Sequence, residues 1–103
     1  MTRFGFHPQA VVDVEEIWDF IAEDNLDAAD RVVADILASV DALVSFPHRG
    51  HRRQDLTSRP LRFTLSRDYL IAYAPDEEPL WVVAVLHGRR NPRVMAAILR
   101  DRE

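Results

Sequence analysis

The sequence predicts an α+β domain in the order β-α-α-β-β-β with a short C-terminal helix, where a helix hairpin packs on a small, mainly antiparallel sheet. Three observations predict it. Apolar residues recur at helical spacing over residues 9–45, strand-like runs fill residues 60–87, and short turns separate those runs. A chain of 103 residues has room for one core, so we expect a single domain over residues 1–103.

A short strand and a long helix are predicted at the start of the chain. Phe4 and Phe6 alternate within a strand over residues 3–7, and Pro8 suits the first turn of a helix, where its missing N–H costs nothing. Over residues 9–23 an apolar stripe lies opposite acidic residues and indicates an amphipathic helix. The stripe consists of Val11, Val14, Ile17, Trp18 and Ile21.

A second helix is predicted over residues 26–45, after a link whose Asp and Asn side chains can cap it. Its main stripe consists of Ala29, Val33, Ile36, Val40 and Leu43. The helix ends before Pro47, because the residue before a proline is disfavoured from the helical conformation. Two helices joined by a short link form an antiparallel hairpin, whose apolar face needs a sheet to cover it.

Three strands follow a basic loop over residues 48–58. We expect them over residues 60–65, 69–74 and 80–87, paired antiparallel because the turns between them are tight. A short helix opening at Asn91-Pro92 and running to Leu99 follows. The sequence leaves open whether residues 100–103 are ordered without a partner.

The last two strands are apolar on both faces, which implies that both faces are covered. In residues 80–87 we expect Leu80, Val82, Ala84 and Leu86 on one face and Trp81, Val83 and Val85 on the other. The hairpin covers one face, and the C-terminal helix, a partner chain or both cover the second. We expect Arg62 on this second face, paired with a carboxylate or at the rim of a groove for an acidic partner segment.

Charge is divided unevenly along the chain. Residues 1–46 hold two arginines against ten acidic residues, a net charge of −8, and residues 47–103 hold eleven arginines against seven acidic residues, a net charge of +4. We therefore expect a dipolar surface with one side that attracts an acidic partner. All 13 basic residues are arginine, so no lysine is available as a nucleophile or proton donor.

Composition excludes several classes of protein. Zero cysteines exclude a disulfide framework, a thiolate zinc site and cysteine chemistry, and three glycines exclude a phosphate-binding glycine-rich loop. No apolar run approaches the roughly 20 residues of a membrane helix, and the N-terminus lacks the apolar stretch of a signal peptide, so we expect a cytoplasmic protein. We expect no metal and no cofactor, since only His48 and His51 have ligand-pair spacing.

Three places carry candidate site residues. The first is residues 48–53, whose two histidines and three arginines either bind phosphate or only keep a long loop solvated. The second is Arg62. The third is residues 87–90, which lie at the end of a strand where Gly88 permits a bend. The candidates for contact with a partner or target are Arg52, Arg53, Arg62, Arg89 and Arg90.

Six segments in this order resemble the RelE/ParE superfamily of toxins from type II toxin–antitoxin systems: Phe6-His7-Pro8, residues 16–21, residues 47–51, Leu61-Arg62-Phe63, residues 69–73 and residues 85–90. The resemblance covers the chain from Arg3 to Leu99 and agrees with the fold expected from the residues. It implies growth arrest by the toxin and a cognate antitoxin partner that wraps it with an acidic C-terminal segment and makes the DNA contacts.

The resemblance leaves three functions open. A ParE-like toxin acts on DNA gyrase without nuclease chemistry. A RelE-like toxin cleaves mRNA on the ribosome, and here Arg62 and Arg89 would stabilise phosphate charge with His51 or His87 as the base. A non-toxic homologue only binds its antitoxin. The absence of lysine and the net charge of −4 favour the ParE-like branch, because docking on ribosomal RNA is chiefly electrostatic.

Overall fold

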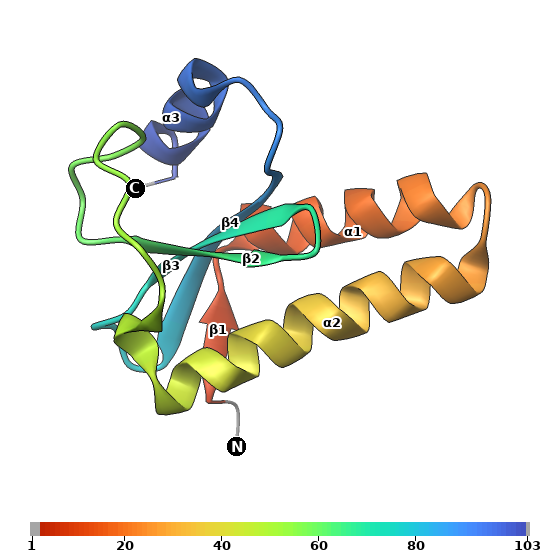
Figure 1. The fold of residues 1–103 in the computed structure, drawn as a ribbon, viewed down its shortest axis with the longest axis horizontal. Helices are drawn as coiled ribbons and strands as arrows, with labels where there is room; N and C mark the ends of the chain where they lie inside the picture. The colour runs from red at the N-terminus through yellow and green to blue at the C-terminus, as the bar shows by residue number, and fades with distance from the viewer. Residues whose placement is uncertain (1–2, 103) are drawn as a thin grey trace.

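The computed structural model describes residues 3–102, which form three α-helices and a four-stranded mixed sheet (Figure 1). The elements are β1 (Phe4–Phe6), α1 (Pro8–Ala22), α2 (Leu26–Ser45), a 3-10 turn (Pro47–Arg49), β2 (Arg62–Ser66), β3 (Tyr69–Ala74), β4 (Leu80–His87) and α3 (Pro92–Arg100). The predicted α+β class and the order of the elements are confirmed.

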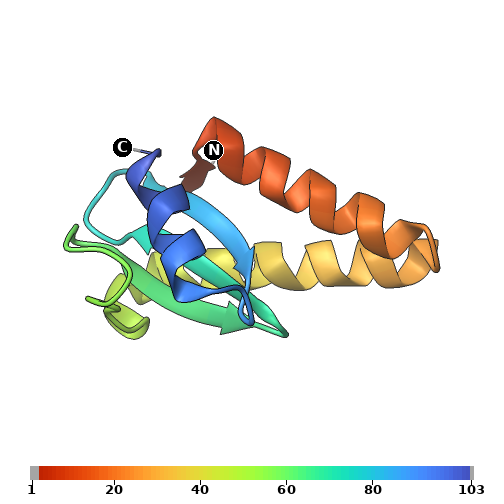
Figure 2. The same cartoon turned by 90° about the horizontal axis from the view of Figure 1, so that it is seen from above.

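The sheet has the strand order β1-β4-β3-β2, so β1 and β2 are its two edges. The strand β1 pairs parallel with β4, and the other pairs are antiparallel. The α1–α2 hairpin lies on one face of the sheet and α3 on the other (Figures 1 and 2). The core therefore has two layers of side chains, one on each face.

Local side chains fix where the hairpin helices begin. The Nδ1 atom of His7 accepts a hydrogen bond from the N–H of Gln9 (3.0 Å) ahead of Pro8, and Oδ1 of Asn25 accepts one from the N–H of Ala28 (2.9 Å). These bonds satisfy N–H groups that have no partner within the first turn of a helix.

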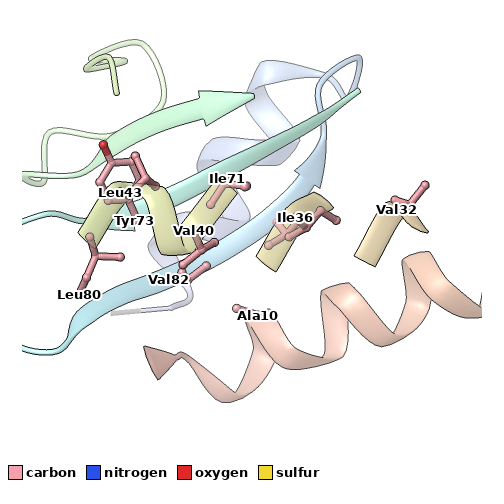
Figure 3. Close-up of a cluster of buried hydrophobic side chains, with 10 residues drawn as sticks. Ala10, Val32, Ile36, Val40, Leu43, Ile71, Tyr73, Leu80 and Val82 are labelled. Atoms are coloured by element: carbon pink, nitrogen blue, oxygen red, sulfur yellow. The ribbon is translucent and has the colours of Figure 1, made fainter. Parts of the chain in front are cut away.

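The hairpin face is closed by apolar side chains, chiefly from α2 (Figure 3). The buried residues of α2 are Ala29, Val32, Ile36, Val40 and Leu43, so four of the five residues of the main predicted stripe are buried and Val33 is only partly buried. In α1 only Ala10 is buried, and the predicted stripe is wrong at Val11, which is 45% exposed. The hairpin extends past the sheet (Figure 1), so Phe20 near its end is 73% exposed.

A β-bulge corrects the predicted faces of β4. The register of β3 and β4 shifts between Ala72 and Tyr73, so β4 contains one extra residue there. Val83 and Ala84 both join the core on the α3 side, Leu86 follows them, and Val85 joins the hairpin face. Strict alternation holds only up to the bulge, so the predicted faces are wrong beyond it.

The second face is closed by the chain itself. Met95 and Leu99 of α3, with Leu56 and Leu61 from the segment before β2, bury this side of the sheet around Phe63. Of the alternatives left open by the sequence, closure by the C-terminal helix is therefore observed, together with a loop that was not expected to contribute.

Arg62 lies on the other face from the one predicted. It pairs with Tyr73, whose side chain belongs to the hairpin core, while Phe63 next to it points to the α3 side. Neighbouring residues of a strand point to opposite faces, so Arg62 rims no groove on the second face. The expected trough beside it on that face is already filled.

A buried ion pair ties the end of the chain to α1. The guanidinium of Arg102, 8% exposed, donates from Nη2 to Oδ1 of Asp13 (2.9 Å) and from Nη1 to Oδ2 and to the carbonyl of Val83. The N–H of Val85 also donates to Oδ2 of Asp13 (2.9 Å). Because β1 ends at Phe6, the Asp13 carboxylate completes this edge of β4. Glu103, the last residue, lies outside the described residues.

Candidate functional site: the basic edge of the sheet

The predicted site residues fall into two groups at opposite ends of β2. Arg52 and Arg62 line a hollow of about 140 Å³, together with His48 and Asp76. Arg89 and Arg90 follow β4 at the other end, where the N–H of Gly88 donates to the carbonyl of Asp68 in the β2–β3 turn (2.7 Å). These two groups do not form one surface pocket.

The four residues of the nuclease hypothesis are not brought together. Arg62 pairs with Tyr73 of β3, and His87 pairs with Tyr69, which lies four residues before Tyr73 on the same strand. At a rise of about 3.3 Å per residue this is about 13 Å along the strands, with about another 10 Å across two strand spacings. The register therefore separates His87 from Arg62, whereas His51, the other candidate base, bridges Phe63 beside Arg62.

Arg62 makes a backbone contact in place of the expected ion pair. Its Nη1 donates to the carbonyl of Gly50 (2.8 Å), and no carboxylate of residues 3–102 forms an ion pair with it. The prediction of a carboxylate partner is therefore wrong. The bond instead holds residues 47–50 beside the start of β2.

The hydroxyl of Tyr73, on β3, also holds residues 47–50 in place. It donates to the carbonyl of Pro47 (2.7 Å) and accepts from the N–H of Gly50 (2.9 Å), and burial raises the pKa of Tyr73. Gly50 has no room for a side chain, since an added Cβ would lie 2.5 Å from this hydroxyl oxygen. The position of residues 47–50 is therefore set by the sheet.

Two of the charged side chains on this loop have partners. Arg53 donates to both carboxylate oxygens of Asp55 (2.9 and 2.8 Å), which raises the pKa of Arg53 and lowers that of the exposed Asp55. Nε2 of His48 lies 3.0 Å from Oδ1 of Asp76. Both pairs are at the surface, where ion pairs contribute little to stability.

The surface near the start of β2 combines His51 and Arg49 of the predicted 48–53 cluster with Leu65 and Phe46, which the sequence did not single out. His51 forms a single antiparallel bridge with Phe63 of the edge strand β2, and the chain before it turns away. Leu65, two residues further along β2, is 63% exposed, and Phe46 nearby in the sequence is 68% exposed. Arg49 lines three hollows in this region and forms no ion pair with residues 3–102.

We call this surface the basic edge: residues 46–53 together with β2 and Arg67. Charge clustering in the sequence pointed to residues 48–53, but Arg49 and Leu65 become neighbours only through the pairing of His51 with Phe63. No local pattern predicts that pairing.

Comparison with known proteins decides the family. Residues 5–92 match the model of a family described as the ParE toxin of the type II toxin–antitoxin system parDE. The chain belongs to this family. The match runs from the second residue of β1 to the first residue of α3 and includes the whole basic edge.

One curated relative and one solved structure are similar to this chain. A Sinorhizobium fredii protein (strain NBRC 101917 / NGR234) named "Putative toxin Y4kP" is 31% identical over an alignment of 100 residues that covers 90% of this chain and 96% of that protein. A solved structure titled "Chromosomal ParDE TA system from P. aeruginosa" has a chain that superposes with a TM-score of 0.65 at 19% identity. The superposition covers 82% of this chain and 92% of the other and shows a shared fold.

Residues 3–102 of this ParE toxin were searched for membrane-spanning helices and for metal-binding groups. None of its helices is long and apolar enough to cross a membrane. No group of three or more histidine and carboxylate side chains in this range is placed to hold a metal ion.

Proposed function

We propose that this ParE toxin inhibits DNA gyrase in the cytoplasm, arrests growth, and is neutralised by a cognate antitoxin through an acidic C-terminal segment. The observation that supports a target other than mRNA is that Arg89 and His87, one of the two candidate bases, are separated from Arg62 by more than 10 Å of sheet at the usual strand spacing. A site that cleaves phosphodiesters needs its base and its cations around one phosphate.

Charge supports the same target. The whole chain carries a net charge of −4, and its acidic residues are concentrated in the helix hairpin. Binding to ribosomal RNA gains most of its free energy from phosphate contacts, and an acidic chain is poorly suited to it. DNA contact belongs, in this proposal, to the antitoxin.

The basic edge is the surface proposed for the antitoxin. Its arginines offer charge-assisted hydrogen bonds to carboxylates, and exposed Phe46 and Leu65 offer apolar anchors between them. Arg52, Arg53 and Arg62 belong to this surface, whereas Arg89 and Arg90 lie at its far end and are candidates for the target.

The test is a supercoiling assay with purified toxin and gyrase. The proposal expects loss of negative supercoiling or accumulation of cleaved DNA, and restoration when the cognate antitoxin, which we expect to be encoded beside the toxin, is added. Cleavage of mRNA on ribosomes with normal supercoiling would instead support the nuclease. Normal growth on expression, with antitoxin binding intact, would support a homologue that has lost toxicity.

A further inference from the structure

We propose that the closed end of the α1–α2 hairpin docks on a basic surface of gyrase, with Phe20 as the apolar anchor and carboxylates around it. We call residues 18–30 the hairpin end: the last turn of α1, the link after it and the start of α2. This inference rests on the proposed gyrase target and names a contact with it apart from Arg89 and Arg90. It commits to one occupant, and not to the antitoxin or a second copy of this chain.

The hairpin end exposes large apolar side chains. It lies beyond the sheet and α3 (Figures 1 and 2), so it takes no part in closing either face. Phe20 on α1 is 73% exposed, and Leu26, the first residue of α2, is 60% exposed. Neither side chain belongs to the core on either side of the sheet. Aromatic and apolar side chains are typical of the centre of a protein interface, so these two offer a partner an anchor.

The hairpin end is held in one shape by its own hydrogen bonds. The N–H groups of Asp24 and Asn25 both donate to the carbonyl of Ile21 (3.1 and 3.0 Å). Across the hairpin, Nε1 of Trp18 donates to Oδ1 of Asp30 (2.9 Å). A surface that is already ordered loses less conformational entropy when it binds. The exposed side chains are therefore presented on a preorganised support.

Negative charge surrounds the apolar side chains. Residues 19–30 contain five acidic residues and no basic one, and all five are exposed and form no ion pair with residues 3–102: Asp19, Glu23, Asp24, Asp27 and Asp30. Asp19 and Glu23 lie at the C-terminal end of α1, where the helix dipole disfavours negative charge. These two carboxylates cost the free chain stability, so folding does not account for their placement.

Charge selects a basic occupant. A second hairpin end or the acidic antitoxin segment would bring like charges together, and nucleic acid or an anionic membrane would be repelled as well. An enzyme that holds DNA presents basic side chains to the phosphates. Opposite charges on two proteins steer them together and speed their association. Of the partners proposed for this chain, gyrase is the one whose charge complements the hairpin end.

The experiment measures binding of the full chain to purified gyrase, together with inhibition of supercoiling. The test variants are Phe20→Ala, which removes the anchor, and Glu23→Lys, which reverses one charge. The matched controls are Leu37→Ala, an exposed apolar side chain on α2 outside the hairpin end, and Glu77→Lys, an exposed carboxylate in the β3–β4 turn. Thermal melting and binding of the cognate antitoxin verify that each variant is folded.

We expect both hairpin-end variants to bind gyrase about tenfold more weakly or worse, and to need correspondingly more toxin for half-inhibition. The controls should match the unchanged chain, and all variants should bind antitoxin normally. Tight gyrase binding and full inhibition by both hairpin-end variants would overturn the docking surface and leave gyrase as the target. Loss of antitoxin binding in place of gyrase binding would assign the hairpin end to the antitoxin and overturn the inference as well. No gyrase binding or inhibition by the unchanged chain would overturn the gyrase proposal itself, and this surface with it.

Discussion

The two faces of the sheet are closed in different ways. On the hairpin face, two long helices bury a series of apolar side chains, including Ile36, Val40 and Leu43 (Figure 3). On the second face, a helix of nine residues contributes only two fully buried side chains, Met95 and Leu99. The first closure is spread over many contacts, and the second needs help from elsewhere in the chain.

The help comes from Leu56 and Leu61 in the segment before β2 and from a buried charge. Two apolar side chains contribute about 1.5–3 kcal/mol each on burial, which is little to hold a helix against a sheet. Arg102, directly after α3, adds an ion pair with Asp13 and a bond to the carbonyl of Val83. The comparison teaches that long helices close the hairpin face with apolar area, whereas α3 shares the closure of its face with Leu56 and Leu61 and is tied at its end by a buried ion pair.

The largest expected effect comes from breaking that contact. Asp13→Ala leaves the guanidinium of Arg102 buried without its carboxylate and the N–H of Val85 without an acceptor. Removing one partner of a buried pair costs about 3–5 kcal/mol, so we expect that loss in the free energy of unfolding, measured by urea titration.

The matched control is Asp19→Ala, an exposed carboxylate on the same helix, which should change the free energy by less than about 0.5 kcal/mol. The double variant Asp13→Ala with Arg102→Ala should lose less than the sum of the single losses, because both remove the same contact. Additive losses would show that the pair does not hold α3.

A smaller loss is expected on the hairpin face. Ile36→Ala removes a fully buried side chain from the centre of the hairpin core and should cost about 2–4 kcal/mol, measured in the same titration. Leu37→Ala, at a half-exposed neighbour, should cost less than about 1 kcal/mol. Equal losses at the two positions would contradict the division of the hairpin into a buried and an exposed stripe.

The sequence predicts this fold well where the pattern is local. The bounds of α2, β3 and β4 match those expected from apolar periodicity, proline and turn residues. The faces of β4 could not be predicted past Val83, because a bulge depends on the partner strand β3 and not on β4 alone. Asp13 was counted with the solvated acidic face of its helix, since nothing local shows that Arg102 reaches it.

The arrangement of the candidate residues could not be predicted from the sequence. The clustering of arginines at residues 48–53 predicts a basic surface, and residues of this segment line hollows beside β2. The face of Arg62 and the separation of Arg62 from Arg89 depend on strand register, which apolar alternation leaves ambiguous when both faces are buried. Arg49 and Leu65 gain their importance only from long-range pairing.

The smallest expected effect sharpens the comparison, because the hairpin face also has one polar contact. The buried hydroxyl of Tyr73 bonds to Pro47 and Gly50, so Tyr73→Phe should lower the free energy of unfolding by about 1 kcal/mol at neutral pH.

Burial raises the pKa of Tyr73 in the folded chain, so the unfolded chain loses this proton first as pH rises. Stability should therefore hold up to the ordinary tyrosine value of about 10 and decline above it, until the pH passes the folded pKa. Urea titrations between neutral pH and pH 11 should show the decline in the unchanged chain and in Tyr69→Phe, and its loss in Tyr73→Phe. The same decline in Tyr73→Phe would assign it to another group and separate the hydroxyl from the stability of the hairpin face.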